Sequence, residues 1–145
     1  MNVYLAAAMT KPDNDLGVIA GLLACLEAEG HVVPTRHVAR PHAREADACA
    51  SDRALAERDL AWLRASDALV AEVTAPSHGV GIEVATAAQI ALPTLVLFRE
   101  GRPVSRLLTG LDGIESASYR DLDGACRTLR SFLVRVAARR EPRNA

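Results

Sequence analysis

Glu83 is the acidic residue whose sequence neighbours are best suited to chemistry. A short apolar run at residues 68–73 ends in threonine, proline, serine and two glycines, and Glu83 follows in or near the first turn of a mostly apolar segment. Such a pattern is typical of a buried strand, a loop and a helix. Free backbone N–H groups and the helix dipole keep a carboxylate ionised at a helix N-terminus, as a nucleophile requires. A glutamate that caps a surface helix is the alternative interpretation.

Asp59 is a second carboxylate in an unexpected position, because it interrupts the apolar stripe of another predicted helix. That helix is expected to begin after an N-cap at Ser51 and to run to about residue 65. Its inward positions, three or four residues apart, are Leu55, Asp59, Trp62 and Leu63. Burial of an unpaired charge is costly, so Asp59 either has a polar partner or borders a cavity. A place at the edge of the stripe is the alternative.

The elements that must position these carboxylates alternate between apolar strands and amphipathic helices. Five strands are predicted, at residues 3–8, 31–35, 68–73, 94–98 and 114–119. The intervening helices are predicted from residue 16 to a stop at Gly30, from Ser51 to 65, over 82–90, over 104–108 with an opening near Ser105, and over 121–138. The alternation predicts an α/β fold, a Rossmann-like or flavodoxin-like three-layer sandwich with a five-stranded, mainly parallel sheet.

Several polar side chains are expected to meet at one edge of this sheet. Ligands of parallel sheets bind at the carboxyl ends of the strands. Tyr4, Ser77 and Glu83 lie at or near such ends, and His37 lies in a polar loop at residues 36–50 that could reach them. Long loops inside compact domains are often functional. The sequence therefore predicts a small-molecule site at this edge.

Composition narrows the class of protein. The 145 residues suffice for one domain with a core, predicted at residues 1–138 and followed by a frayed tail at 139–145. The formal net charge of −1 argues against non-specific nucleic-acid binding, and no apolar run approaches membrane-spanning length. Cys25, Cys49 and Cys126 lack metal-binding spacing, and isolated thiols indicate a reducing cytoplasm rather than a disulfide framework.

Local patterns spread over nearly the whole chain resemble a known family. They are Val3-Tyr4, Thr35-x-His37-Val38-Ala39, Asp59-Leu60-x-Trp62-Leu63, Ala71-Glu72-Val73-Thr74-x-Pro76-Ser77-x-Gly79-Val80-Gly81-x-Glu83 and, more weakly, Gly101-Arg102-x-Val104-Ser105. In this order they resemble the nucleoside 2-deoxyribosyltransferase superfamily, and most closely its 2′-deoxynucleoside 5′-monophosphate N-glycosidase branch.

The resemblance implies a retaining N-glycosidase that needs no cofactor and no metal. Glu83 would attack the anomeric carbon and form a glycosyl ester that water resolves. Asp59 would help to protonate the departing base or position the reacting groups, and Tyr4 would hold the carboxylate in place beside the sugar. His37 would stack on or near the base, or it is a loop histidine with its own partner. Glu72, the rival carboxylate, also belongs to the family pattern, but it lies inside a buried strand and faces the packing layer of the sheet or its edge, so we expect it to have a structural role.

The resemblance also implies a phosphate site that two subunits share. Ser77 and the amides around Gly79 and Gly81 would cradle the 5′-phosphate, and Ser105 would reach the phosphate of the neighbouring subunit in a homodimer.

The chain departs from the branch at the loop that follows its first strand. The branch usually has Gly-Ser-x-Arg there, whereas this chain has Ala7-Ala8-Met9-Thr10. Lys11 offers a point charge in place of the arginine fork. We therefore expect a narrower preference for monophosphates over nucleosides.

Two other functions use the same residues differently. A transferase would move deoxyribose between bases with the same nucleophile. A non-catalytic nucleotide-binding or sensor domain is less consistent with the chain, because a sensor need not keep Tyr4, Asp59 and Glu83 together.

Overall fold

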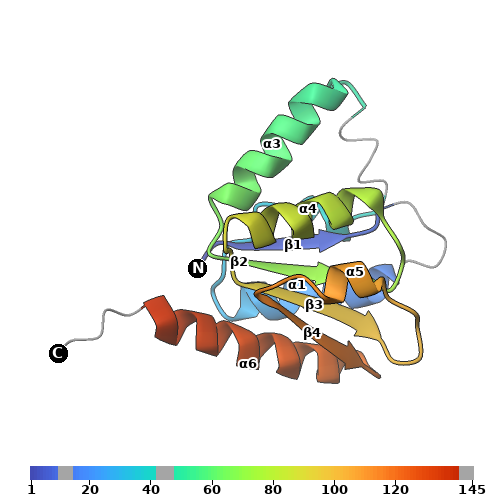
Figure 1. Cartoon of the computed structure of the whole chain (residues 1–145), viewed down its shortest axis with the longest axis vertical. Coiled ribbons are helices and arrows are strands. Elements are labelled where there is room, and N and C mark those ends of the chain that lie inside the picture. Colours follow the sequence, from blue (N-terminus) through green and yellow to red (C-terminus); the bar gives the residue numbers. More distant parts are fainter. Residues whose placement is uncertain (10–14, 42–47, 141–145) are drawn as a thin grey trace.

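The computed structural model describes residues 1–9, 15–41 and 48–140 and shows an α/β fold around a parallel sheet (Figure 1). The strands are β1 (Val3–Ala7), β2 (Ala68–Glu72), β3 (Thr94–Arg99) and β4 (Ile114–Tyr119), and they lie in the order β1-β2-β3-β4. All three neighbouring pairs are parallel. Every residue of β1 and β2 is buried, as expected where helices cover both faces of a sheet. The predicted fold class is confirmed.

The second of the five predicted strands forms only one bridge, so the sheet has four strands. Val32 pairs with Asn2 in parallel. Pro34 then follows, and it has no N–H to continue a ladder. The Thr35 hydroxyl pairs with β1 in place of a backbone group. It accepts from the Leu5 N–H at 3.0 Å and donates to the Leu5 carbonyl at 2.7 Å. One side chain thus replaces the next pair of backbone hydrogen bonds.

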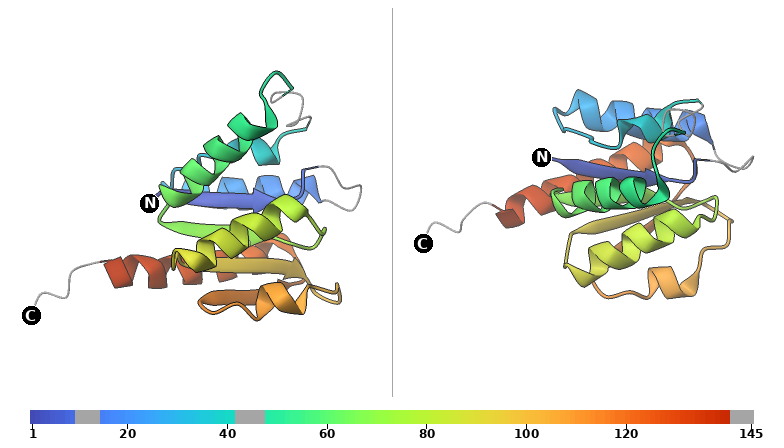
Figure 2. Two further views of the ribbon diagram at one scale, coloured as in Figure 1. Left: turned by 45° about the horizontal axis from the view of Figure 1, so that its top comes forward. Right: turned by 90° about the horizontal axis from the view of Figure 1, so that it is seen from above.

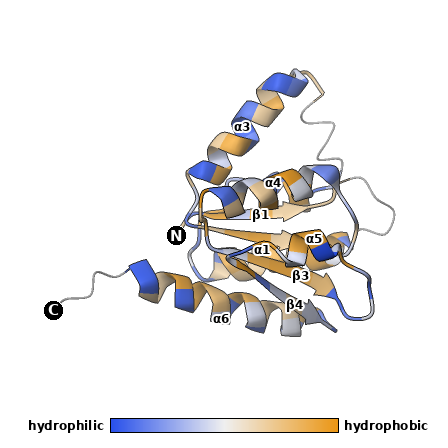
Figure 3. Ribbon diagram, in the orientation of Figure 1, coloured by the Kyte–Doolittle hydropathy of each residue, from blue (hydrophilic) through white to orange (hydrophobic). Residues whose placement is uncertain are grey.

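Helices cover the sheet in two layers (Figure 2). The first layer consists of α1 (Leu16–Ala28) and α6 (Leu122–Arg140). The second consists of α3 (Asp52–Arg64), α4 (His78–Gln89) and α5 (Arg106–Thr109). A 3-10 turn, η1 (Arg36–Ala39), packs on β1 and α1. Apolar residues concentrate in the central strands and on the inner faces of the helices (Figure 3).

Because side chains alternate along β1, successive residues pack against different layers of helices. Val3 and Leu5 pack into the core beneath α1 and α6. Tyr4 and Ala6 pack into the core on the α3 and α4 side. Successive strand residues point to opposite faces, so the strand itself delivers the Tyr4 hydroxyl to the second layer.

Helix ends mostly follow the expected local chemistry. The Ser51 hydroxyl accepts from the Ala54 N–H at 3.2 Å and caps α3 as predicted. Gly30 adopts a φ of +76° just after α1, which is the left-handed conformation that favours glycine. The last helix reaches Arg140, two residues beyond its predicted end, and residues 141–145 lie outside the described part. Within the described ranges, no helix has the length and apolar character needed to cross a bilayer.

The predicted inward stripe of α3 is only partly inward. Leu63 is fully buried, whereas Leu55, Asp59 and Trp62 are intermediate in exposure. The N-terminal part of α3 projects away from the rest of the molecule (Figure 1), so the sheet covers only its C-terminal part. Asp59 lies between these two parts.

Glu72 has the structural role expected of it. It is 3% exposed and lies on the α1 and α6 side of β2, since its side chain alternates with that of Ala71. Its carboxylate accepts from the Tyr119 hydroxyl at 2.9 Å, from the Thr74 N–H at 3.2 Å and from the Thr74 hydroxyl. Burial raises the pKa of Tyr119 to about 12, so the phenol remains a donor.

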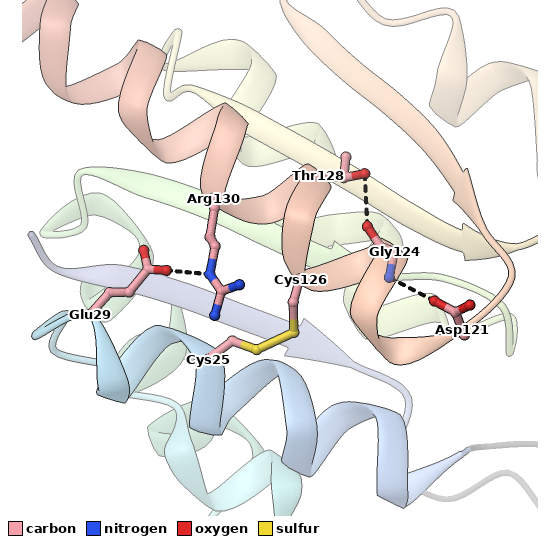
Figure 4. Close-up of a disulfide and its surroundings, with 7 residues drawn as sticks. All are labelled: Cys25, Glu29, Asp121, Gly124, Cys126, Thr128 and Arg130. Atoms are coloured by element: carbon pink, nitrogen blue, oxygen red, sulfur yellow. Dashed lines mark hydrogen bonds and ion pairs between the residues drawn. A yellow bond between two sulfur atoms is a disulfide. The ribbon is translucent and has the colours of Figure 1, made fainter.

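Cys25 and Cys126 form a disulfide that joins α1 to α6, with their Cα atoms 6.3 Å apart (Figure 4). Figure 4 also shows an ion pair between Glu29 and Arg130 across the same two helices. The expectation of isolated thiols was therefore wrong for this pair, and Cys49 alone is a free, exposed cysteine. The two sulfurs are 101 residues apart in sequence, and only the packing of α1 on α6 brings them together.

The disulfide predicts a redox-dependent stability. Closing a loop of about 100 residues restricts the unfolded chain, so Cys25→Ser should lower the free energy of unfolding by about 2–4 kcal/mol. Reductant should lower the denaturation midpoint of the wild type to a similar extent and leave that of Cys25→Ser unchanged. Cys49→Ser is the control and should behave like the wild type. Titration of three free thiols in unreduced, denatured wild type would contradict the disulfide.

Candidate active site

The Tyr4 hydroxyl donates a 2.5 Å hydrogen bond to Oε1 of Glu83, which joins β1 to α4. Tyr4 is 2% exposed. Burial, together with the nearby Glu83 carboxylate, raises the pKa of Tyr4 well above its ordinary value, so the phenol keeps its proton and remains a donor. The bond fixes the orientation of the carboxylate.

The expectation that a helix N-terminus keeps Glu83 ionised was wrong, because the residue lies in the second turn of α4 and is largely removed from water. Burial raises its pKa to about 7, the hydrogen bond from Tyr4 acts in the opposite direction, and the negative charge of Asp59 adds to the rise. At neutral pH the carboxyl group is therefore divided between its protonated and ionised forms. Shifted carboxyls of this kind are frequent at catalytic sites.

The first turn of α4 lies beside this carboxylate. The Ser77 hydroxyl accepts from the Val80 N–H at 3.5 Å and caps the helix. Gly79 and Gly81 lie inside α4 rather than in the loop before it, and Glu83 lies in the second turn. The Gly81 N–H donates to the Ser77 carbonyl at 3.1 Å, so the helix already uses it.

A cavity of about 220 Å³ opens in front of Glu83. We call it the carboxylate cavity. Its lining comprises Tyr4, Ala6, Ala7, Met9, Thr35, His37, Val38, Asp59, Ser77, Gly79, Val80 and Glu83. These residues come from β1, η1, α3 and the start of α4, which meet at the carboxyl ends of β1 and β2. This is the edge at which the sequence predicted a site.

Asp59 forms the α3 side of the cavity and is held by its neighbour. Arg58 donates from Nε to Oδ1 of Asp59 at 2.9 Å. The same guanidinium lies over the Trp62 ring, 4.7 Å from its centroid. The His37 ring lies 5.9 Å from Trp62, centroid to centroid, at an angle of 56°. A chain of contacts thus runs from His37 on η1 through Trp62 and Arg58 to Asp59, and its two ends, His37 and Asp59, line the cavity.

A second, larger depression lies between α4 and α5. It has a volume of about 590 Å³, and we call it the α4–α5 groove. Its lining is mostly apolar and includes Ile82 and Leu107, which are 60% and 80% exposed. Ser77 and Val80 border both the groove and the carboxylate cavity, so the two depressions adjoin.

The structure brings together most of the residues that the sequence proposed for the site. Tyr4, His37, Asp59, Ser77, Gly79 and Glu83 line the carboxylate cavity. Among the described residues, Gly81 and Ser105 line the α4–α5 groove instead. Lys11 lies outside the described residues.

Sequence reasoning gave no role to Thr35, which it quoted only within a pattern, and it did not single out Arg58. Thr35 could have been found as the residue that follows a proline at the end of a predicted strand. Arg58 could have been found as an arginine four residues before Trp62, a spacing that stacks side chains on a helix. Within the described residues, no group of three or more histidines, cysteines or acidic residues is placed to hold a metal ion.

This arrangement suits nucleophilic chemistry at a saturated carbon. Glu83 is a carboxylate of adjustable charge with a fixed orientation, and Asp59 is a second carboxylate in the lining of the same cavity. Such a pair can divide the roles of nucleophile and proton donor or base.

Comparisons with known proteins point to one family. A family model described as nucleoside 2-deoxyribosyltransferase matches residues 3–132. The chain is 38% identical over 113 residues to the 5-hydroxymethyl-dUMP N-hydrolase of Mus musculus, which covers 75% of this chain and 65% of the mouse protein. It is 36% identical over 137 residues to a Thermofilum pendens protein, across 92% of this chain and 95% of that protein. That relative is named, provisionally, a 2′-deoxynucleoside 5′-phosphate N-hydrolase.

Solved structures show the same fold. A CMP N-glycosidase from Clostridium botulinum superimposes with a TM-score of 0.69 at 20% identity, covering 91% of this chain and 99% of that one. A 2-deoxyribosyltransferase from Bacillus psychrosaccharolyticus superimposes with a TM-score of 0.62 at 14% identity, covering 86% and 90%.

The raised pKa of Glu83 predicts a pH-dependent stability. Between about pH 4.5 and 7 the folded protein holds a proton that the unfolded chain has released, so stability from this group falls as the pH rises through that window. Glu83→Gln removes the free-energy cost of burying an ionised carboxylate, and its amide oxygen can still accept the hydrogen bond from Tyr4. We expect this variant to melt about 2–6 °C above the wild type near pH 8, and the difference to shrink towards pH 4.5.

Melting curves across that pH range provide the measurement. Glu57→Gln, which changes an exposed glutamate of α3, is the control and should leave the pH dependence as it is. A Glu83→Gln variant that follows the wild type at every pH would mean that Glu83 titrates normally.

Proposed function

Because the chain belongs to the nucleoside 2-deoxyribosyltransferase family, we propose that it hydrolyses the N-glycosidic bond of (2′-deoxy)nucleoside 5′-monophosphates. The products are the free base and (deoxy)ribose 5-phosphate. The observation that carries the proposal is the buried Tyr4–Glu83 pair, which presents one oriented carboxylate to a small cavity. The names of the relatives support hydrolysis of nucleotides.

Glu83 is the nucleophile in this reaction. Its ionised oxygen bonds to C1′ of the sugar as the bond from C1′ to the base nitrogen breaks, and the electron pair of that bond leaves with the base. A water molecule then attacks C1′ of the glycosyl ester and gives up a proton to Asp59 or to solvent. The bond from C1′ to the Glu83 oxygen breaks, which releases the sugar phosphate and restores the carboxylate. The Tyr4 hydroxyl holds the attacking group in place and stabilises its ionised form.

Asp59 serves the departing base from the opposite wall of the cavity. The leaving nitrogen must gain a proton or a hydrogen bond as its bond to the sugar breaks. Asp59 either supplies that proton or orients the reacting groups, and His37 lies on the same side to contact the base.

The 5′-phosphate lies against the start of α4. The Ser77 hydroxyl and the first N–H groups of the helix, including that of Gly79, offer donors to an anion. Ala8 and Thr10 replace the serine and arginine that this branch usually has. Lys11 adds a single positive charge in this proposal.

A second subunit completes the phosphate site. Apolar depressions with exposed leucine and isoleucine are typical of interfaces, and the α4–α5 groove adjoins the carboxylate cavity at Ser77. A homodimer formed over this groove would bring Ser105 of one subunit towards the phosphate of the other. The proposed nucleotide substrate is the ground on which we assign the protein to the cytoplasm, since the Cys25–Cys126 disulfide removes the argument from isolated thiols.

Transfer of deoxyribose to another base is the second candidate function. The presence of Ala8 and Thr10 in place of the usual serine and arginine favours transfer, because the chain then lacks contacts that would select monophosphates.

The proposed activity is tested with a panel of nucleosides and their 5′-monophosphates, by detection of free base and sugar phosphate. Glu83→Gln should lower kcat by roughly a thousandfold or more while the protein stays folded, because an amide cannot form the ester. Mass spectrometry should find the glycosyl group on the peptide that contains Glu83. Addition of an acceptor base separates hydrolysis from transfer. Near-normal turnover by Glu83→Gln would contradict the mechanism.

The shared site predicts complementation between inactive variants. Ser105→Asp should repel the phosphate of the neighbouring subunit, and Glu83→Gln should disable its own site. A mixed dimer of the two variants has one intact site, so random reassociation should restore about a quarter of wild-type activity. Arg106→Asp, which changes the neighbouring charge and lies outside both the groove lining and the quoted patterns, is the control for Ser105→Asp and should keep the activity. Mixtures without recovery, or an active monomer, would contradict the shared site.

A further inference from the structure

Arg58 is a charged residue beside the carboxylate cavity to which the proposed mechanism gives no task. Its Nε lies 2.9 Å from Oδ1 of Asp59, and its guanidinium carbon lies 4.7 Å from the centroid of Trp62. The side chains of Arg58 and Asp59 are each 30% exposed. The ion pair is therefore partly shielded from water, and its strength exceeds that of a fully exposed pair.

The geometry of this contact is unusual for a helix. Adjacent residues such as Arg58 and Asp59 point about 100° apart around the helix axis, whereas residues four apart, such as Arg58 and Trp62, lie on one side. Arg58 thus lies along the Trp62 ring and turns its Nε towards the neighbouring carboxylate. A planar guanidinium can stack on a ring and donate in its own plane at the same time, which a lysine ammonium cannot.

Asp59 needs such support because α3 is weakly anchored. Leu63 is the one buried residue of this helix, all of whose residues the structure describes. The Trp62 ring, which Arg58 covers, contacts the ring of His37 on η1. The chain of contacts from His37 through Trp62 and Arg58 therefore ties Asp59 to the body of the protein.

The charge of Arg58 also matters, because Asp59 and Glu83 share one cavity. The titratable groups that line this cavity are Tyr4 from β1, His37 from η1, Asp59 from α3 and Glu83 from α4. Arg58 lies outside the lining and pairs with Asp59. The negative charge of Asp59 raises the pKa values of Glu83 and Tyr4, and the positive charge of Arg58 lowers that of Tyr4. Removal of Arg58 therefore leaves the negative charge of Asp59 without a neighbouring positive charge that opposes it.

We propose that Arg58 is a positioning residue of the glycosidic reaction, which fixes the Asp59 carboxylate in the wall of the cavity and offsets its charge beside Glu83. The expected effect on turnover rests on the proposed function. The expected effect on the position of Asp59 rests on the contacts described above. Arg58 acts through Asp59 and does not itself touch the reacting atoms.

The kinetic test compares Arg58→Met with Arg58→Lys. The substrate is the 2′-deoxynucleoside 5′-monophosphate that the wild type cleaves fastest. Arg58→Met should lower kcat by about tenfold to a hundredfold with little change in KM, because the misplaced carboxylate assists the departing base poorly. The acid limb of its kcat/KM profile should move to higher pH. Arg58→Lys should restore the position of that limb and only part of the kcat.

Arg53→Met is the matched control. Arg53 lies five residues earlier on the same helix and pairs with Glu57 at 2.8 Å, but its side chain is 88% exposed and its partner, unlike Asp59, lies outside the cavity lining. This variant should retain wild-type kinetics. An Arg58→Met enzyme that also retains them would overturn the proposal.

A double-mutant cycle separates a positioning role from general destabilisation. In the Asp59→Asn background, Arg58→Met should cause no further loss of kcat, since the group through which it acts is already gone. An equal loss in both backgrounds would overturn the proposal. If the wild type cleaves no nucleotide or nucleoside, the proposed function fails. The melting temperatures of the same four proteins then test the contact itself, because an effective pair gives non-additive changes and strictly additive changes would overturn it.

Discussion

The hydrogen bond between the Tyr4 hydroxyl and the Glu83 carboxylate is the interaction on which the rest of the site depends. It connects the first strand to the helix that follows the second strand, so it forms only when the sheet and α4 are both in place. Burial opposes the ionised carboxylate, and the phenol partly offsets that cost. The reactivity of Glu83 is thus a property of the folded chain, and no glutamate at a surface helix terminus would share it.

The two layers of helices have different roles, one in stability and the other in forming the site. On one side of the sheet, α1 and α6 bury a continuous apolar core and are joined by the Cys25–Cys126 bond. On the other side, α3 projects from the body, and α4 and α5 leave an apolar groove between them. Sites that must admit a ligand or a second subunit are drawn from the less tightly packed parts of a protein. Here the covalently joined layer supports the sheet, and the open layer carries the cavity.

Local patterns predicted much of the fold and of the candidate site, because their causes are local. The apolar runs became buried parallel strands, Ser51 and Gly30 bounded helices, and Glu83 followed a Gly-containing segment into α4. The failures have non-local causes. Thr35 ends strand pairing through a hydroxyl whose partner is thirty residues away, and the cysteine pair depends on how α1 packs on α6. The sequence did not distinguish Arg58 from a surface arginine, because its contacts with the Trp62 ring and with the cavity residue Asp59 appear only in the folded protein.

The Thr35 hydroxyl has a consequence for how copies of the protein can associate. β1 lies at one edge of the sheet, and an edge strand with unpaired backbone groups can recruit a strand from another molecule. Here the Val3 N–H donates to the Val32 carbonyl, and Thr35 occupies both the N–H and the carbonyl of Leu5. The N–H groups of Val3 and Leu5 and the carbonyl of Leu5 are therefore already hydrogen-bonded to Val32 and Thr35 of the same chain. An approaching strand has fewer hydrogen bonds to gain there, so this part of the edge disfavours strand-by-strand polymerisation.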